Sequence, residues 1–141
     1  MGSGDTLQHM AFFGRALTVW LAIIVAETIH GTVRTLAIEP MLGGVTARQI
    51  SVFTGSLIIF ALTMLLIKWM NPRTVLQAIL IGALWVALTL GFELLLGRYV
   101  IGLSWDRLIA DYDLSRGGLM LLGILFLFAV PLLSARLREV L

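Results

Sequence analysis

The sequence VLQAILIGALWVALTLGFELLLG, residues 75–97, is apolar almost throughout, and its one ionisable residue is Glu93. A helix rises 1.5 Å per residue, so about 20 residues cross the ~30 Å hydrocarbon core of a bilayer. Three further blocks are long and apolar enough to do the same, and they cover residues 11–36, 50–70 and 117–137. The sequence therefore predicts four transmembrane spans.

The overall composition is also that of a membrane protein. Hydrophobic residues make up 60% of the chain and charged residues 13%, and the mean hydropathy is +1.02. A backbone in lipid must satisfy its own hydrogen bonds, so the spans are expected to be helices. We predict an all-α fold, namely an integral membrane four-helix bundle in which residues 1–141 form a single transmembrane domain. We expect it in a bacterial inner membrane.

Cysteine content and charge exclude several classes of function. The chain has no cysteine, which excludes disulfides, thiol redox chemistry and cysteine-ligated metal or iron–sulfur cofactors. The formal net charge of +2 reflects Lys and Arg residues beside the spans, so it does not indicate nucleic-acid binding. The expected partners are membrane lipids, other membrane subunits or a second copy of this chain, and the nature of any cofactor stays open.

Four spans place both termini on one side of the membrane, called side A here, together with the short turn 68–73. Side B holds the loop 39–49 and the segment 98–116. Lys and Arg residues are equally numerous on the two sides, so the positive-inside rule does not orient the chain. The arginines of side B alternate with acidic residues that can pair with them, which favours side A as the cytoplasmic side.

The strongest local pattern is Glu27-x-x-His30-x-x-x-Arg34, whose spacing puts the three side chains on one helical face. An ionisable residue at the depth of Glu27 is costly in hydrocarbon, so it needs an interior or aqueous partner. Glu93 falls in the same half of the membrane. We therefore predict a polar cluster near side B, with ligand- or ion-binding candidates Glu27, His30, Arg34, Glu93 and Arg98.

Segment 98–116 mixes apolar and charged residues. Ser104 is a preferred residue type for a helix N-cap, and Asp106 would favour the first turn that follows. We predict a short amphipathic helix from Trp105, lying in the membrane interface with Trp105 and Tyr112 at headgroup depth. It either covers the end of the bundle or acts as a lid over a polar vestibule. The lid and vestibule candidates are Arg48, Trp105, Asp106, Asp111, Asp113 and Arg116.

Two rows of small residues predict close contacts between helices. One row is Ser51 and Gly55 in the second span, and the other is Ala83, Ala87 and Gly91 in the third. We expect both rows inside the bundle. The alternative is that a row forms an interface between copies of the chain, in which case it would lie uncovered on the outside.

Three functions fit these features. The favoured one is a structural, accessory or binding subunit of a membrane assembly or homo-oligomer. The second is a small proton- or cation-coupled transporter or channel that uses Glu27, His30 and Glu93. The third is a membrane-embedded enzyme for a lipid-like substrate, because Glu27-x-x-His30 has the spacing of carboxylate-bridged metal sites in bundles. We assign no catalytic residue, and Glu27 and His30 are the only metal-ligand candidates.

The stretch 26–32, AETIHGT, resembles the first helix of the small multidrug-resistance transporters, which also have about four helices and a carboxylate in the first. That resemblance implies a transport function. It covers only these residues, and the long 98–116 segment departs from the compact pattern of that family. The chain is therefore not assigned to it.

Overall fold

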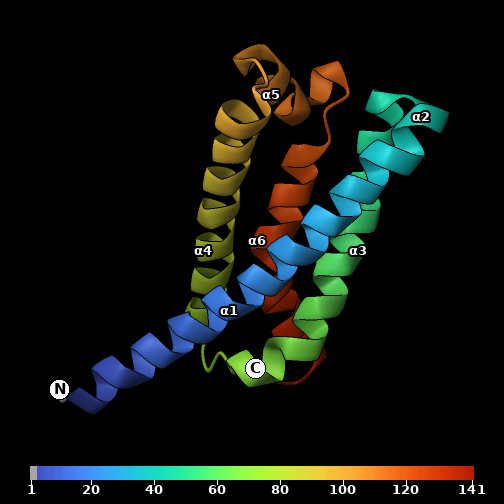
Figure 1. Ribbon diagram of the computed structural model, residues 1–141. Helices are drawn as coiled ribbons and strands as arrows, with labels where there is room; N and C mark the ends of the chain where they lie inside the picture. Colours follow the sequence, from blue (N-terminus) through green and yellow to red (C-terminus); the bar gives the residue numbers. More distant parts are fainter. Residues whose placement is uncertain (1–2) are drawn as a thin grey trace.

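The computed structural model describes residues 3–141, and these residues contain helices and no strand. The long helices are α1 (Ser3–Val33), α3 (Gly44–Met70), α4 (Val75–Leu94) and α6 (Met120–Leu137) (Figure 1). The α1 helix continues through the π-helical η1 (Arg34–Ile38) into α2 (Glu39–Leu42), and α4 continues into the π-helical η2 (Leu95–Ile101). Four helical stretches are long and apolar enough to cross a membrane, which confirms the predicted all-α class and the four long apolar helices.

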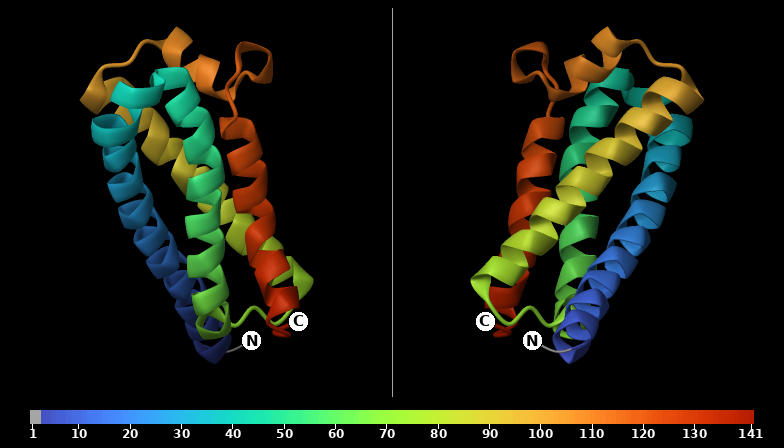
Figure 2. Two further views of the ribbon diagram at one scale, coloured as in Figure 1. Left: turned by 90° about the vertical axis from the view of Figure 1, so that its right-hand side faces the viewer. Right: turned by 90° about the vertical axis from the view of Figure 1, so that its left-hand side faces the viewer.

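Both termini and the connection between α3 and α4 lie at one end of the molecule, which corresponds to side A (Figure 2). The opposite, side-B end carries α2, α5 (Trp105–Tyr112) and the short 3-10 helix η3 (Leu114–Arg116). The α6 helix packs against both α3 and α4, whereas α1 packs mainly against α3. In Figure 1, α1 crosses α4 obliquely and ends beside α3.

The buried core lies in the side-A half of the bundle. Trp85 of α4 is fully buried, and its indole Nε1 donates a hydrogen bond to the Ala16 carbonyl of α1 at 2.9 Å. Gly82 sits one turn earlier, where an added Cβ would collide with the Phe128 carbonyl of α6. The other large buried side chains here are Val19, Ile23, Ile67, Met70, Ile81 and Val130. Because α4, α6 and α1 meet closely in this half, the bundle is tightest near side A.

Three of the four long helices extend further than hydropathy predicts, and the fourth is shorter. The prediction of a loop over residues 39–49 is wrong, because α2 and the beginning of α3 occupy these residues. The chain turns only at Gly43, whose φ of 85° favours glycine. Residues 98–101, expected in the interfacial segment, complete the third helix as far as Gly102. The fourth helix begins at Met120 rather than residue 117. Apolarity marks the part that crosses a bilayer, whereas a helix continues wherever its backbone hydrogen bonds can form.

The row formed by Ser51 and Gly55 is buried, as expected. A Cβ added at Gly55 would lie 2.7 Å from Oε2 of Glu27, so α1 places its carboxylate directly over this glycine. The small residue in α3 thus makes room for a charged side chain from α1 rather than for a second backbone.

The other small-residue row faces outward, so the expectation that it lies inside the bundle is wrong. Ala83, Ala87 and Gly91 are all exposed, and nothing lies within 4 Å of a Cβ added at Gly91. The α4 helix instead turns Gly82 and Trp85 towards its neighbours. A bulky indole and a glycine together fill the contact that the alanine row was expected to make.

The close approach at Gly82 gives opposite expectations for two glycines of one helix. Gly82→Ala should lower the free energy of unfolding by about 1–3 kcal/mol, because the new methyl group meets backbone that can move only with α6. Gly91→Ala should raise it by about 0.5–1 kcal/mol, because alanine favours the helix and meets no obstacle. Equilibrium unfolding of both variants in detergent micelles checks this, and a stabilising Gly82→Ala would contradict the close approach of α4 to the backbone of α6.

Candidate functional site

A cavity of about 1100 Å³ lies in the side-B half, between α1 and α3 on one side and α4 and α6 on the other. Its walls in the helices are largely apolar, and they include Ile24, Val52, Ile59, Leu90, Phe92 and Leu127. Residues of α5 line its side-B edge. A volume of this size accommodates a small organic molecule.

The cavity gathers most of the candidates predicted from sequence. Those that line it are Glu27, His30, Arg34, Arg48, Glu93, Trp105, Asp111 and Arg116. Three candidates do not line it, namely Arg98, Asp106 and Asp113. Arg98 instead donates a hydrogen bond to the Leu103 carbonyl at 3.1 Å, and its guanidinium lies 5.3 Å from the ring centre of Trp105.

Glu27 and His30 contact each other and α3. Nδ1 of His30 lies 3.7 Å from Oε2 of Glu27, and its Nε2 lies 2.6 Å from the Thr54 hydroxyl. That hydroxyl is 3.3 Å from the Ile50 carbonyl, to which it donates. Its lone pairs are then available to accept from Nε2 of His30. Nδ1 then faces the carboxylate of Glu27. A proton on Nδ1 or on the Glu27 carboxyl group favours the contact between them.

Several polar atoms around the cavity are buried without a hydrogen-bond partner among the described residues. They are Oε1 of Glu27, Nε of Arg34 and Oγ of Ser51. A buried polar atom left without a partner costs about 1–3 kcal/mol. All three residues line the cavity, so water or a polar ligand within it can supply the missing bonds.

Arg34 lies within electrostatic range of Glu27 and of Glu93. It is the first residue of η1, and its charge acts on both Glu27 and Glu93. Glu93 in turn lies just before η2, in the last turn of α4. π-Helical segments are rare and occur frequently at functional sites. Both of the π-helices in residues 3–141 begin beside this cluster.

The predicted short helix is present as α5, and Ser104 caps it by accepting from the backbone N–H of Arg107 at 3.2 Å. Arg107 also donates to Asp111 at 2.7 Å, and Nε of Arg48 in α3 lies 3.3 Å from the same carboxylate. Asp111 therefore connects α5 to α3 over the side-B end of the cavity.

The chain after α5 is held to the same end of the bundle. Arg116 donates two hydrogen bonds of 3.1 Å to Asp106, and Gln49 of α3 donates to the Gly117 carbonyl at 2.8 Å. The two bonds from Arg116 hold the pKa of Asp106 below its usual range. Asp113, which was predicted to belong to a vestibule, instead accepts from the backbone N–H and hydroxyl of Ser115.

Tyr112 supplies a neutral donor at the cavity. Burial, together with the negative charges of Glu93 and Asp111, raises the pKa of Tyr112 to about 12. Its hydroxyl therefore stays protonated over the physiological pH range. Sequence reasoning placed Tyr112 only at headgroup depth, and the structure adds a position in the cavity lining.

Sequence reasoning did not include Arg107 and Thr89 among the site candidates, although both line the cavity. The ion pair of Arg107 could have been predicted from sequence, because Arg107 lies four residues before Asp111 on a short amphipathic helix. Thr89 carried no such signal. Its hydroxyl accepts from Nε1 of Trp20 at 3.0 Å, a pairing that only the crossing of α1 and α4 creates.

Comparisons with protein-family models, curated proteins and solved structures find no match to this chain.

The link through Asp111 gives a testable expectation for α5. Asp111→Asn removes the charge that Arg48 and Arg107 share, and a hydrogen bond to a charged group contributes about 1.5–3 kcal/mol. Amide hydrogen exchange across residues 105–112 should become at least about ten-fold faster. Asp5→Asn removes one charge near side A and should leave α5 unchanged. Equal exchange in both variants would show that α5 is held by apolar contacts alone.

Proposed function

We propose that this chain inserts into a membrane as a four-span protein and binds a small amphipathic molecule in the side-B cavity. One observation carries the proposal: the cavity combines apolar walls with ionisable side chains that belong to the apolar spans themselves. Interhelical polar contacts in membranes average under about 1 kcal/mol, so stability alone is a weak reason to retain Glu27, Arg34 and Glu93 there.

The arrangement of α1 supports entry from the bilayer. As far as Trp20, α1 packs against α4, and the two rings of Trp20 and Phe92 meet edge to face at 6.3 Å. Beyond this crossing α1 follows α3, as the contacts of Glu27 with Gly55 and of His30 with Thr54 require. The cavity occupies the space between the diverging halves of α1 and α4, so a ligand dissolved in lipid can enter between these helices.

The atoms without partners define the polar part of the ligand. Oε1 of Glu27 requires a donor, and Nε of Arg34 requires an acceptor. A head group with both functions, such as a hydroxyl, an amide or a zwitterion, satisfies them together. The hydroxyl of Tyr112 adds a donor, and the apolar walls receive the hydrocarbon part of the ligand.

Two observations favour more specific roles for a ligand-binding protein of this kind. The contact between Glu27 and His30 suits a carrier in which ligand binding is coupled to a proton or a cation. The uncovered row of Ala83, Ala87 and Gly91 suits a subunit of a larger assembly or a homo-oligomer. Placement in a bacterial inner membrane, with side A cytoplasmic, belongs to the same proposal.

Native mass spectrometry of protein released gently from its own membrane tests the proposal. The wild-type protein should carry a bound small molecule, and Glu27→Gln should reduce its occupancy at least about ten-fold, because a charge-assisted hydrogen bond is lost. Glu139→Gln is the control, since Glu139 is exposed beyond α6 at the opposite end of the bundle.

Two outcomes would contradict ligand binding. One is a wild-type protein that carries no small molecule but remains bound to other chains, which would favour a purely structural subunit. The other is equal ligand occupancy in Glu27→Gln and Glu139→Gln, which would show that the carboxylate of Glu27 does not bind the ligand.

A further inference from the structure

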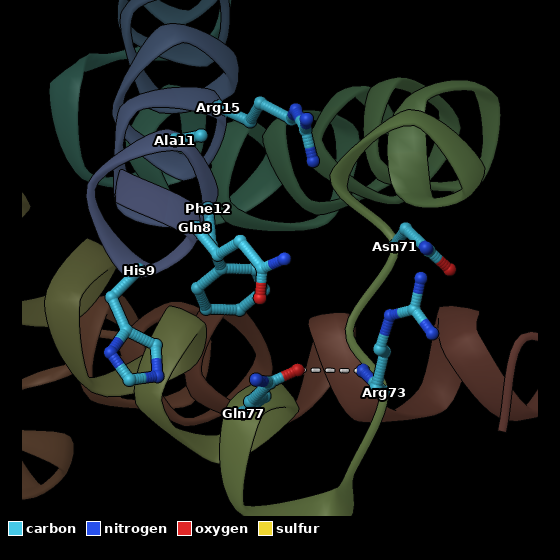
Figure 3. A pocket seen from close by; sticks show the side chains of 8 residues that line it. All are labelled: Gln8, His9, Ala11, Phe12, Arg15, Asn71, Arg73 and Gln77. Carbon is cyan, nitrogen blue, oxygen red and sulfur yellow. Dashed lines mark hydrogen bonds between the residues drawn. The ribbon is translucent and has the colours of Figure 1, made fainter. Parts of the chain in front are cut away.

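A second pocket, of about 470 Å³, lies at the side-A end of the molecule, away from the cavity. The first turns of α1 form one side of it, and the α3–α4 connection with the first turn of α4 forms the other (Figure 3). Its polar lining consists of Gln8, His9, Arg15, Asn71, Arg73 and Gln77. The aromatic ring of Phe12 and the methyl group of Ala11 complete the lining.

The pocket has an excess of positive charge. Arg15 and Arg73 both line it, no carboxylate does, and neither guanidinium forms an ion pair within the described part of the chain. In Figure 3 the two guanidinium groups come from different elements, with the Gln8 side chain also directed into the space they border. Two like charges on one pocket repel each other, so an anion between them would be stabilised.

The backbone that carries Arg73 is well defined. Oε1 of Gln77 accepts from the N–H of Arg73 at 2.7 Å, as drawn in Figure 3. Asn71 takes a left-handed conformation that ends α3, and Pro72 is fully buried. Thr74 then caps α4 by accepting from the N–H of Gln77 at 3.1 Å. These contacts hold Arg73 opposite α1 in the absence of a ligand.

We propose that this pocket binds the phosphate group of an anionic membrane lipid. A guanidinium group donates paired hydrogen bonds to phosphate oxygens, and the amides of Gln8 and Asn71 add neutral donors. The pocket lies where the apolar helices end, which is the level of lipid head groups in a four-span protein. Basic pockets of this kind between helix ends recognise lipid phosphates. This site is separate from the side-B cavity and from its ligand.

The test uses the full chain in nanodiscs of phosphatidylcholine alone or mixed with phosphatidylglycerol, with retained lipid measured by native mass spectrometry. The wild type should retain phosphatidylglycerol in preference to phosphatidylcholine. The double variant Arg15→Gln/Arg73→Gln should lose this preference, with retention lowered on the order of ten-fold. Arg15→Lys/Arg73→Lys should keep part of it, since charge remains but the paired hydrogen bonds do not.

Lys68→Gln/Arg136→Gln is the matched control, because Lys68 and Arg136 lie in the last turns of α3 and α6 and neither lines the pocket. It removes two charges from the same end of the bundle, as the double arginine variant does, and should leave retention within about two-fold of wild type. Thermal unfolding of each variant identifies any loss of fold. An equal loss of retention in this control would show that net charge alone causes the effect, and it would overturn the proposed site.

Inorganic phosphate, added to protein in phosphatidylcholine nanodiscs, separates a lipid from a free anion. If it raises the thermal stability of the wild type while phosphatidylglycerol is not preferentially retained, the lipid assignment is overturned and the pocket is a soluble-anion site. If neither the retention of phosphatidylglycerol nor the stabilisation by inorganic phosphate depends on Arg15 and Arg73, no anion binds in this pocket. Failure at this pocket leaves the side-B proposal unaffected, because Arg15 and Arg73 do not line that cavity.

Discussion

Close packing in the side-A half is the constraint on which the rest of the structure depends. Gly82 lets α4 approach the backbone of α6 at Phe128, and the indole of Trp85 is held against the backbone of α1 at Ala16. Helices in contact at one end and inclined to each other must separate towards the other end. The α1 helix crosses α4 and then follows α3, so the separation falls between α1 and α4, and the cavity occupies it.

The cavity explains how ionisable residues are accommodated within apolar helices. The carboxylate of Glu27 rests on Gly55, His30 reaches Thr54, and Arg34 lies within electrostatic range of two carboxylates. These contacts satisfy only part of the hydrogen-bonding capacity of the cluster, since polar atoms of Glu27, Arg34 and Ser51 are left without partners in the described chain. The proposed binding of a ligand depends on these atoms without partners.

The two ends of the bundle differ in chemistry. Near side B, acidic and basic groups alternate and compensate each other, as in the pairing of Asp111 with Arg48 and Arg107. Near side A, the pocket beside Arg15 and Arg73 has no acidic residue in its lining. The first arrangement holds α5 at the end of the bundle through charge pairs, whereas the second leaves a positive field that suits an anion. The uncovered row of Ala83, Ala87 and Gly91 is a third feature, on the outer face of α4.

The sequence by itself determined the helical class and the four apolar stretches, because both follow from hydropathy. It also determined the short helix capped by Ser104, through capping chemistry, and the concentration of Glu27, His30, Arg34 and Glu93 in one half, through their spacing. It did not determine the helix ends at Gly43 and Gly102, since hydropathy does not report where backbone hydrogen bonds stop. Only the tertiary structure decided that Ala87 faces outward while Gly82 faces α6. It also decided that Arg107 lines the cavity and that Arg98 does not. When a helix is apolar on every side, its sequence does not indicate which face packs against neighbouring helices. That face is determined by how the helices pack, here by the crossing of α1 over α4.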